Sequence, residues 1–466
     1  MIIKLKKSKT LKKIFFKILD FLIISTKLNL INKDFSPRKI VIWLAETGSR
    51  DFIPRMSQAI SLWEEYQIPS LIIHKHLLKK INKNILENSI VIDKSATSTC
   101  IRRLRYAKLN GALNLVIPEE LLLCDESQSL IQGCLHPKTL NYVDYVLSGS
   151  KEVSKYIQKQ KKPINLLGLL NPRLNTLLIQ KNCKEILNKK NSIEKYFKHD
   201  YILINDKLSL KFSSYKDEIN LLENDIFKST SINPKEYVKN FLKEEEIKEN
   251  LLLDLIKGIR EEELFDNFKI ILRPHPTVDM DKYKNYFREK LKDSYDYLII
   301  REGIAMEWMQ HAKIIFHNNC TTAIEGYFGG LRNIFNYSNN LSDGTSEEFK
   351  SFLKPLGVKN SITEAKDLIS LNKENYSKKY SELINNNKNL YVFLGEKMSK
   401  NKSQKSIDYK YIKKLENHKF TNFSVKDRWK DAEKRIEFIK KNNAFFDKLC
   451  IKAIGKIGVK VGSLYE

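Results

Sequence analysis

Two polar segments in the second half of the chain each follow a short apolar run, and both could bind a phosphate. In the first, the run at 268–273 leads into Pro274-His275-Pro276. The two prolines hold the histidine on a stiff, non-helical segment, and imidazole can donate a hydrogen bond or a positive charge to a phosphate. The alternative is a rigid exposed turn.

The second segment, residues 316–326, runs through a polar turn into a predicted helix that begins near Thr321. Free N–H groups and hydroxyls at a helix N-terminus can bind a phosphate. Glu325 lies one turn further on, where a carboxylate could bind a ribose; the alternative is an ordinary N-cap with a helix-dipole partner. Together the two segments favour a nucleotide mono- or diphosphate site. Its predicted ligands are Arg273, His275, Asn319, Thr321, Thr322 and Glu325.

Carboxylates in the first half could supply the general base that transfer to a hydroxyl group requires. The loop after the first predicted strand contains Glu46 and Asp51, with Arg50 available to bind an acidic sugar. The turn Pro118-Glu119-Glu120, which follows the fourth predicted strand, is a second source. We rank Glu46 first and Glu120 second, and the alternative for each acid is a helix cap or a solvated charge. No Ser-His-Asp or Cys-His nucleophile set is indicated.

The acids Asp279 and Asp281 have the spacing of a metal site, but Asp281 is well placed to cap a predicted helix over 282–290. His275 and a helix N-terminus can offset leaving-group charge without a metal. We therefore predict neither a metal nor a cofactor. The six cysteines show no Cys-x-x-Cys spacing, which fits a reducing, cytoplasmic compartment.

These residues need a scaffold, and the chain alternates short β-branched runs with longer amphipathic runs. That pattern indicates parallel sheets covered on both faces. We predict an α/β fold of two Rossmann-like domains, 37–180 and 195–396, with the ligand between them at the carboxyl ends of strands. Strands are expected at 39–45, 69–74, 89–93, 112–117, 142–147, 201–205, 268–273, 297–301, 313–316 and 333–337.

The net charge of +26 suggests an anionic partner. Lysine greatly outnumbers arginine, the residue that best reads bases and phosphates, so we predict no nucleic-acid partner. Residues 1–36 predict a basic amphipathic helix suited to an anionic membrane surface, or alternatively one docked on the protein itself. Its apolar stretch is too short to span a bilayer. A basic helical tail is expected over 397–466.

The Arg-Pro-His-Pro segment at 273–276, followed by His-Asn-Asn-Cys-Thr-Thr at 317–322, resembles the bacterial surface carbohydrate biosynthesis proteins. These are glycosyltransferases of the GT-B class, with two Rossmann-like domains. Residues 44–52, 169–178 and 202–206 are similar to further segments of that family. The chain departs from the family pattern at Leu170, Asn175 and Asn333, where the family has Gly, an acid and Pro.

A His-Pro loop paired with a hydroxyl-rich loop also occurs in bacterial polysialyltransferases and teichoic-acid glycerophosphate polymerases. The resemblance implies that His275, Thr321 and Thr322 contact the donor phosphate and that Glu325 binds the ribose. We also expect Asn205, which ends the strand opening the second domain, to bind substrate.

The expected activity is a metal-independent, inverting glycosyl transfer at the inner face of the plasma membrane. The donor would be a nucleotide-sugar, with a CMP-linked acidic sugar as one candidate. The acceptor would be a surface polysaccharide, such as capsule or lipopolysaccharide, or a lipid-linked glycan. A CDP-polyol phosphotransferase, a UDP-sugar 2-epimerase and a non-catalytic membrane-associated scaffold remain open alternatives.

Overall fold

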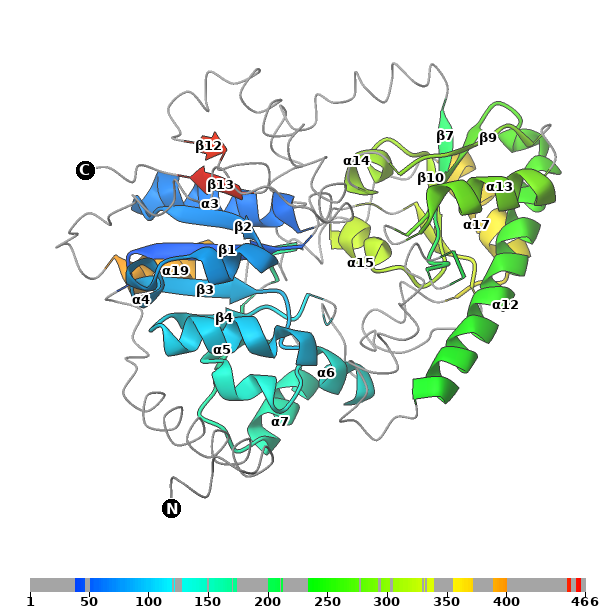
Figure 1. Ribbon diagram of the computed structural model, residues 1–466. Helices are drawn as coiled ribbons and strands as arrows, with labels where there is room; N and C mark the ends of the chain where they lie inside the picture. The colour runs from blue at the N-terminus through cyan, green and yellow to red at the C-terminus, as the bar shows by residue number, and fades with distance from the viewer. Residues whose placement is uncertain are drawn as a thin grey trace.

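Two mainly parallel sheets organise the protein in the computed structural model (Figure 1). The structure describes residues 38–46, 51–119, 121, 128–148, 151–169, 171–173, 200–209, 211–212, 234–275, 278–291, 295–301, 305–328, 331, 333–338, 355–371, 389–399, 451–453 and 458–461. Arg50, Glu120 and the predicted helix over 1–36 lie outside these ranges. Within them, no helix is long and apolar enough to cross a membrane.

The first domain contains an eight-stranded sheet in the order β12-β13-β2-β1-β3-β4-β5-β6. Every residue of its central strands β1 to β4 is buried, as expected for parallel strands covered on both faces. Its parallel strands are β1 (Ile40–Ala45), β2 (Ser70–His74), β3 (Ser89–Asp93), β4 (Leu113–Val116), β5 (Tyr145–Leu147) and β6 (Asn165–Leu167). The intervening helices are α3 (Phe52–Tyr66), η1 (Lys75–Lys80), α4 (Lys83–Glu87), η2 (Ser98–Cys100), α5 (Ile101–Leu109), α6 (Gln128–Cys134), η3 (Thr139–Tyr142) and α7 (Lys151–Lys159).

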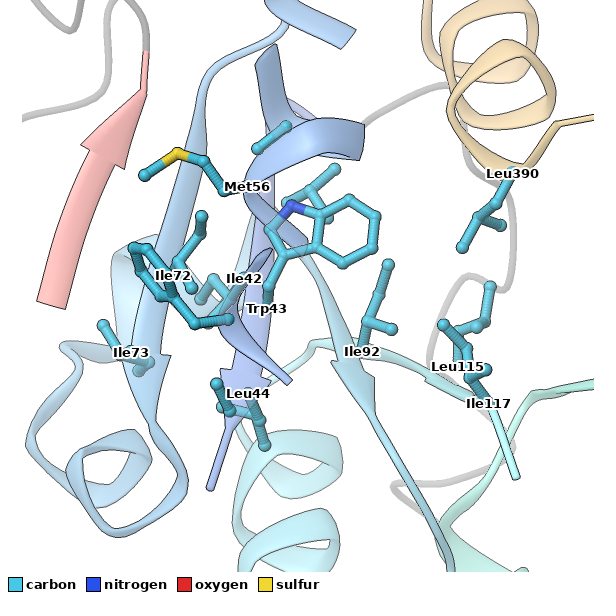
Figure 2. Close-up of a cluster of buried hydrophobic side chains, with 14 of the residues drawn as sticks. Ile42, Trp43, Leu44, Met56, Ile72, Ile73, Ile92, Leu115, Ile117 and Leu390 are labelled. Atoms are coloured by element: carbon cyan, nitrogen blue, oxygen red, sulfur yellow. The ribbon is translucent and has the colours of Figure 1, made fainter. Parts of the chain in front are cut away.

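The core of this domain surrounds Trp43 of β1, which is fully buried and donates its indole N–H to Ser70 Oγ at 3.2 Å. Figure 2 shows Leu390 of α19 (Leu390–Met398) reaching the same cluster from a distant part of the chain. Helix α19 packs against α3, and Gly395 permits this because a Cβ there would lie 2.3 Å from the Tyr66 ring. Residues 390–396, assigned from sequence to the second domain, therefore pack on the first.

Strands β12 (Ile451–Ala453) and β13 (Gly458–Val461) extend the first sheet in antiparallel fashion. Val459 pairs with Ile72, so β13 covers the edge of β2 and its otherwise unpaired backbone groups. The prediction of a helical tail over 397–466 is wrong for these seven residues. Their backbone hydrogen bonds are made between β12 and β13 and with the edge of β2, which is distant in sequence.

The second domain contains a five-stranded parallel sheet in the order β11-β10-β7-β8-β9, with its own apolar core. Its strands are β7 (Tyr201–Asn205), β8 (Lys269–Arg273), β9 (Tyr297–Ile299), β10 (Ile314–His317) and β11 (Ile334–Asn336). Its helices are α12 (Pro234–Arg260), η5 (Glu263–Phe265), α13 (Met280–Lys290), α14 (Ala305–Met309), α15 (Thr321–Phe328) and α17 (Val358–Leu371). All ten strands expected from sequence are present, and the predicted α/β class with two Rossmann-like domains is confirmed.

The strand orders locate where ligands bind in such sheets. In both domains the strand that follows the first strand lies on one side of it, and a later strand lies on its other side. This reversal falls between β1 and β3 in the first sheet and between β7 and β10 in the second. Ligands of open α/β sheets bind outside the carboxyl ends of strands at these switch points.

Candidate functional site

A polar row crosses the carboxyl end of the second sheet. Asn336, His317, Asn205 and Arg273 end β11, β10, β7 and β8, and each is paired in register with the next. Because paired residues of parallel strands point to the same face, all four side chains lie on one face of the sheet. The sequence placed Asn205 and Arg273 in the site, whereas it gave no sign that His317 joins them.

Helix α15 packs on that same face and brings its N-terminus to the end of β10. A Cβ on Gly326 would lie 2.3 Å from Met309 Cε and 2.8 Å from Ile334 Cδ1, so glycine allows α15 to approach α14 and β11 closely. The helix begins at Thr321, after Asn319 in the left-handed region with a φ of 59°. Thr321 and Thr322 are half-buried, so the predicted phosphate-binding hydroxyls stand in the first turn of a helix.

A buried hydrogen-bond network holds the loops after β7 and β10. Asp206 accepts hydrogen bonds from Tyr283 Oη at 2.7 Å and from Asn318 Nδ2 at 2.8 Å, while Asn318 Oδ1 accepts from the Lys207 N–H at 2.8 Å. Burial raises the pKa of Asp206 to about 7, although the hydrogen bonds from Tyr283 and Asn318 lower it. The network makes the ends of β7 and β10 rigid, which suits a binding site.

The His275 loop follows β8, on the other side of β7 from α15. His275 is half-buried, and its carbonyl accepts the Val278 N–H at 3.1 Å. Because β8 and β10 both flank β7, their ends lie about 10 Å apart, or twice the strand spacing. A phosphate group outside β7 could therefore contact both loops.

The acid pair Asp279 and Asp281 lies at the start of a helix, but Asp279 is the residue that caps it. Asp279 is the N-cap of α13 and accepts from the N–H groups of Asp281 at 3.1 Å and Lys282 at 3.2 Å. The prediction that Asp281 caps the helix is wrong, since Asp281 lies in its first turn. Among the described residues, no cluster of three His, Cys, Asp or Glu side chains could hold a metal ion.

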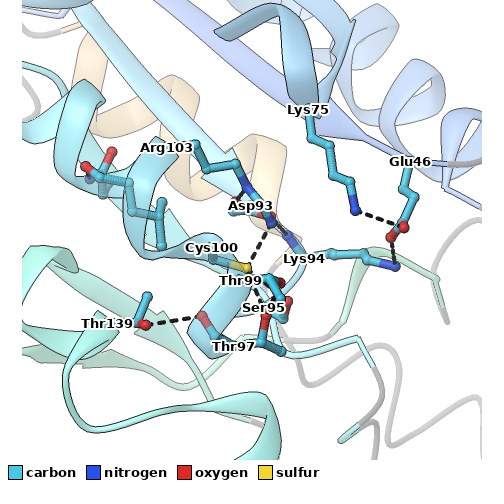
Figure 3. A network of polar contacts seen from close by, with 12 residues as sticks. Glu46, Lys75, Asp93, Lys94, Ser95, Thr97, Thr99, Cys100, Arg103 and Thr139 are labelled. Atoms are coloured by element: carbon cyan, nitrogen blue, oxygen red, sulfur yellow. Dashed lines mark hydrogen bonds and ion pairs between the residues drawn. The ribbon is translucent and has the colours of Figure 1, made fainter. Parts of the chain in front are cut away.

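Glu46, our first choice of base, lies after β1 at the switch point of the first sheet. Its carboxylate forms ion pairs with Lys75 at 2.7 Å and with Lys94 at 2.5 Å (Figure 3). Burial raises the pKa of Glu46, but Lys94 and Lys75 lower it by more, so the pKa lies well below its ordinary value. A carboxylate held ionised by two ammonium groups is a weak base, so its surroundings do not favour the role we predicted.

Glu119 lies one residue before Glu120 in the turn from which the sequence prediction chose Glu120. It is 3% exposed, and Arg55 Nη2 lies 2.7 Å from its Oε1. Burial raises the pKa of Glu119, and the charge of Arg55 opposes this only in part. Asp51, also buried, accepts the Glu46 N–H at 2.9 Å, and its carbonyl accepts from Arg55 Nη1 at 2.8 Å.

An ion pair joins the two domains beside these residues. Arg173 Nη2 contacts the Glu325 carboxylate, and Arg173 Nη1 donates to the Glu119 carbonyl at 3.4 Å. Glu325 projects from α15, the helix that lies between the two sheets in Figure 1. The residue expected to bind ribose is therefore engaged by the first domain in this structure. Arg173 therefore connects the turn that contains Glu119 to helix α15 of the second domain.

A second polar network lies beside Glu46, and its side chains form hydrogen bonds with one another. Arg103 donates to Asp93 through Nε at 2.5 Å and through Nη2 at 3.0 Å, and to the Cys100 thiol at 2.7 Å (Figure 3). These three residues are buried. The network ties the end of β3 to α5 and so positions Lys94 beside Glu46.

Two Rossmann-like domains, each with polar residues at the switch point of its sheet, give this chain a GT-B-like two-domain fold. No family model matches this chain, and no curated protein sequence matches it either. Its fold is similar to the UDP-GlcNAc 2-epimerase of Neisseria meningitidis at 12% identity, covering 78% of this chain and 99% of that one, with a TM-score of 0.46. The corresponding enzyme of Methanocaldococcus jannaschii shows 14% identity, 72% and 94% coverage and a TM-score of 0.45.

The wall teichoic acid polymerase TagF is similar at 13% identity, covering 83% of this chain and 95% of that chain, with a TM-score of 0.46. These TM-scores are all below 0.5. A structural similarity of this degree carries no argument about function.

Proposed function

We propose that this protein is an enzyme that binds a nucleotide-activated sugar in its second domain and transfers the sugar to a glycan or glycolipid hydroxyl at its first domain. One observation carries the proposal. The predicted phosphate ligands follow β8 and β10, the two strands on either side of β7. Glu325 of α15, the helix that begins with Thr321 and Thr322, forms an ion pair with Arg173 of the first domain, and Arg173 also contacts the backbone carbonyl of the buried acid Glu119. This arrangement supports a donor site on one domain and a proton acceptor on the other.

The second domain would hold the donor phosphate. His275 and the first turn of α15, with Thr321 and Thr322, offer hydrogen-bond donors from both sides of β7. The half-buried Arg273 at the end of β8 adds a positive charge. These groups would stabilise the negative charge on the leaving phosphate oxygen as its bond to the anomeric carbon breaks.

The first domain would supply the base, and its geometry favours Glu119 over Glu46. A general base works best when its pKa lies near the working pH, and burial moves the pKa of Glu119 in that direction. The Glu119 carboxylate would take the proton of the acceptor hydroxyl while the acceptor oxygen bonds to the anomeric carbon. Asp51 lies close enough to influence this acid, since its charge further raises the pKa of Glu119.

Two other reactions would use the same donor site. A CDP-polyol phosphotransferase would bring the acceptor hydroxyl to phosphorus instead of carbon, and a UDP-sugar 2-epimerase would need no acceptor. Turnover of CDP-glycerol alone would favour the first. Conversion of a UDP-sugar in the absence of any acceptor would favour the second.

A thermal-shift panel of CMP, CDP, UDP, GDP and their sugars tests the donor site. Wild-type protein should show a Tm increase with one nucleotide and its sugar, and His275→Ala should lose most of it. His311→Ala is the matched control, because His311 is also half-buried but precedes β10 at the opposite end of the strand. No nucleotide-dependent shift in wild-type protein would overturn the proposal.

A further inference from the structure

Two residues of the polar row occupy the switch point of the second sheet. Asn205 ends β7, His317 ends β10, and the two are direct partners in the register of these adjacent strands. Their side chains therefore lie next to each other on the face that α15 covers. This is the position at which open α/β sheets bind their ligands.

Both side chains are buried without hydrogen-bond partners. Asn205 is 3% exposed and His317 is 1% exposed. Within the described residues, the amide oxygen and nitrogen of Asn205 and both ring nitrogens of His317 make no hydrogen bond. Buried polar side chains nearly always have partners, because leaving them without any destabilises the folded protein. Four such atoms on two adjacent residues are therefore an unusual local feature.

Neighbouring asparagines show that the region can satisfy its polar groups. Asn318, fully buried, donates to Asp206 and accepts from the Lys207 N–H. Asn336 donates to Asn319 Oδ1 at 2.6 Å. Asn319 Nδ2 and Tyr337 Oη, close by, also lack partners among the described residues. Asn205 and His317 differ from them because all the polar side-chain atoms of two paired residues are unpartnered within that part of the chain.

The chemistry of the two groups indicates what they would bind. The Asn205 amide is uncharged, and burial lowers the pKa of His317 to about 3, so its imidazole is neutral at physiological pH. The amide therefore offers N–H donors and an accepting oxygen, and the neutral imidazole offers one N–H donor and one accepting nitrogen. Neither favours a phosphate. A hydroxyl group, which both donates and accepts, matches this pair.

We infer that Asn205 and His317 bind hydroxyl groups of the sugar ring next to the phosphate in the nucleotide ligand. The inference rests on the proposed function, because the phosphate is placed at the adjacent N-terminus of α15. Such hydroxyls have two possible sources, the ribose and the transferred sugar. The two sources share one chemistry and can be separated by experiment.

The experiment compares ligand-induced Tm shifts in wild-type protein, Asn205→Leu and His317→Leu. The probes are CDP, UDP and GDP, their 2′,3′-dideoxy forms, UDP-glucose and GDP-mannose. If the pair binds ribose, each variant should respond to a ribonucleotide only as strongly as wild-type protein responds to the dideoxy form. If it binds the transferred sugar, each variant should lose the extra shift of the nucleotide-sugar over the nucleotide.

The Tm of the ligand-free variants gives a second readout. Removing unpartnered polar groups should raise it by about 2–4 °C. Asn318→Leu is the matched control, a buried asparagine of the same loop that has partners, and its Tm should fall. Asn205→Ser and His317→Asn, which keep the sites polar but shorten the side chains, replace any leucine variant that does not fold and should lose the same ligand increment.

The outcomes separate this inference from the proposed function. If no probe shifts wild-type protein, both fail together. If wild-type protein responds and the variants keep both the ribose and the sugar increments, only the inference fails. A lower Tm together with unchanged ligand increments would assign the pair to a buried water molecule.

Discussion

Replacing His317 with leucine should make the protein more resistant to acid. The imidazole is buried, and burial lowers its pKa to about 3, whereas the unfolded chain has the ordinary value of 6.5. Below pH 6.5 the unfolded state therefore takes up a proton that the folded state does not. The stability that depends on neutral His317 is fully present above pH 6.5 and is lost as the pH falls toward 3.

The size of this effect follows from the width of the pH window. From pH 6.5 to 4.5 the imidazole contributes a loss of about 3 kcal/mol, at about 1.4 kcal/mol per pH unit. Asp206 acts in the opposite direction. Its pKa is raised from 3.8 to about 7, so its contribution is greatest below pH 3.8 and is lost as the pH rises through 7. Between pH 7 and 4.5 it adds about 3 kcal/mol, and in wild-type protein the two effects nearly cancel.

Each substitution should therefore expose the other effect. We expect the free energy of unfolding of His317→Leu to gain about 3 kcal/mol, relative to wild-type protein, on going from pH 7.5 to 4.5. Asp206→Asn should lose a similar amount over the same interval. Urea unfolding followed by tryptophan fluorescence, at both pH values and constant ionic strength, measures these differences, with His311→Leu as the half-buried control. A His317→Leu profile parallel to that of wild-type protein would refute the reasoning.

Three further results are expected. Arg173→Met should lower the free energy of unfolding by about 3–5 kcal/mol, because it leaves Glu325 without its partner. In a double-mutant cycle, adding Glu325→Met should restore part of this loss. Strictly additive losses would contradict the interdomain ion pair. Glu119→Gln should reduce kcat about 10²- to 10⁴-fold with little change in donor KM, and the model of the base is wrong if Glu46→Gln has the larger effect. Deleting residues 1–36 should abolish cosedimentation with phosphatidylglycerol vesicles and leave the nucleotide-induced Tm shift intact; vesicle binding by the truncated protein would exclude that segment as the anchor.

The regular elements could be predicted wherever local pattern and burial agree. Strands such as β3 consist of consecutive buried residues, and a β-branched run reveals them directly. Strand β6 escaped prediction because it has only three residues, two of which are not fully buried. Strands β12 and β13 escaped because their pairing with β2 joins segments far apart in sequence, which no local period records.

For the candidate site as well, sequence predicted some residues and could not identify others. The spacing of His275 and Thr321 after two apolar runs was visible, and the structure places both beside β7. Sequence could not distinguish Glu119 from Glu120, since adjacent acids differ only in which one the fold buries. Nor could it show that Lys75, which begins η1, and Lys94, which follows β3, converge on Glu46.

The two switch points differ in a way that suggests which domain binds the nucleotide. Between β1 and β3, the charge of Glu46 is already balanced by Lys94 and Lys75, so a ligand there would have to displace existing ion pairs. Between β7 and β10, Asn205 and His317 are neutral and unpartnered within the described residues, so a ligand would add hydrogen bonds without breaking any. Nucleotide binding should therefore favour the second domain, while the first domain contributes through its buried acids and the contact of Arg173 across the interface.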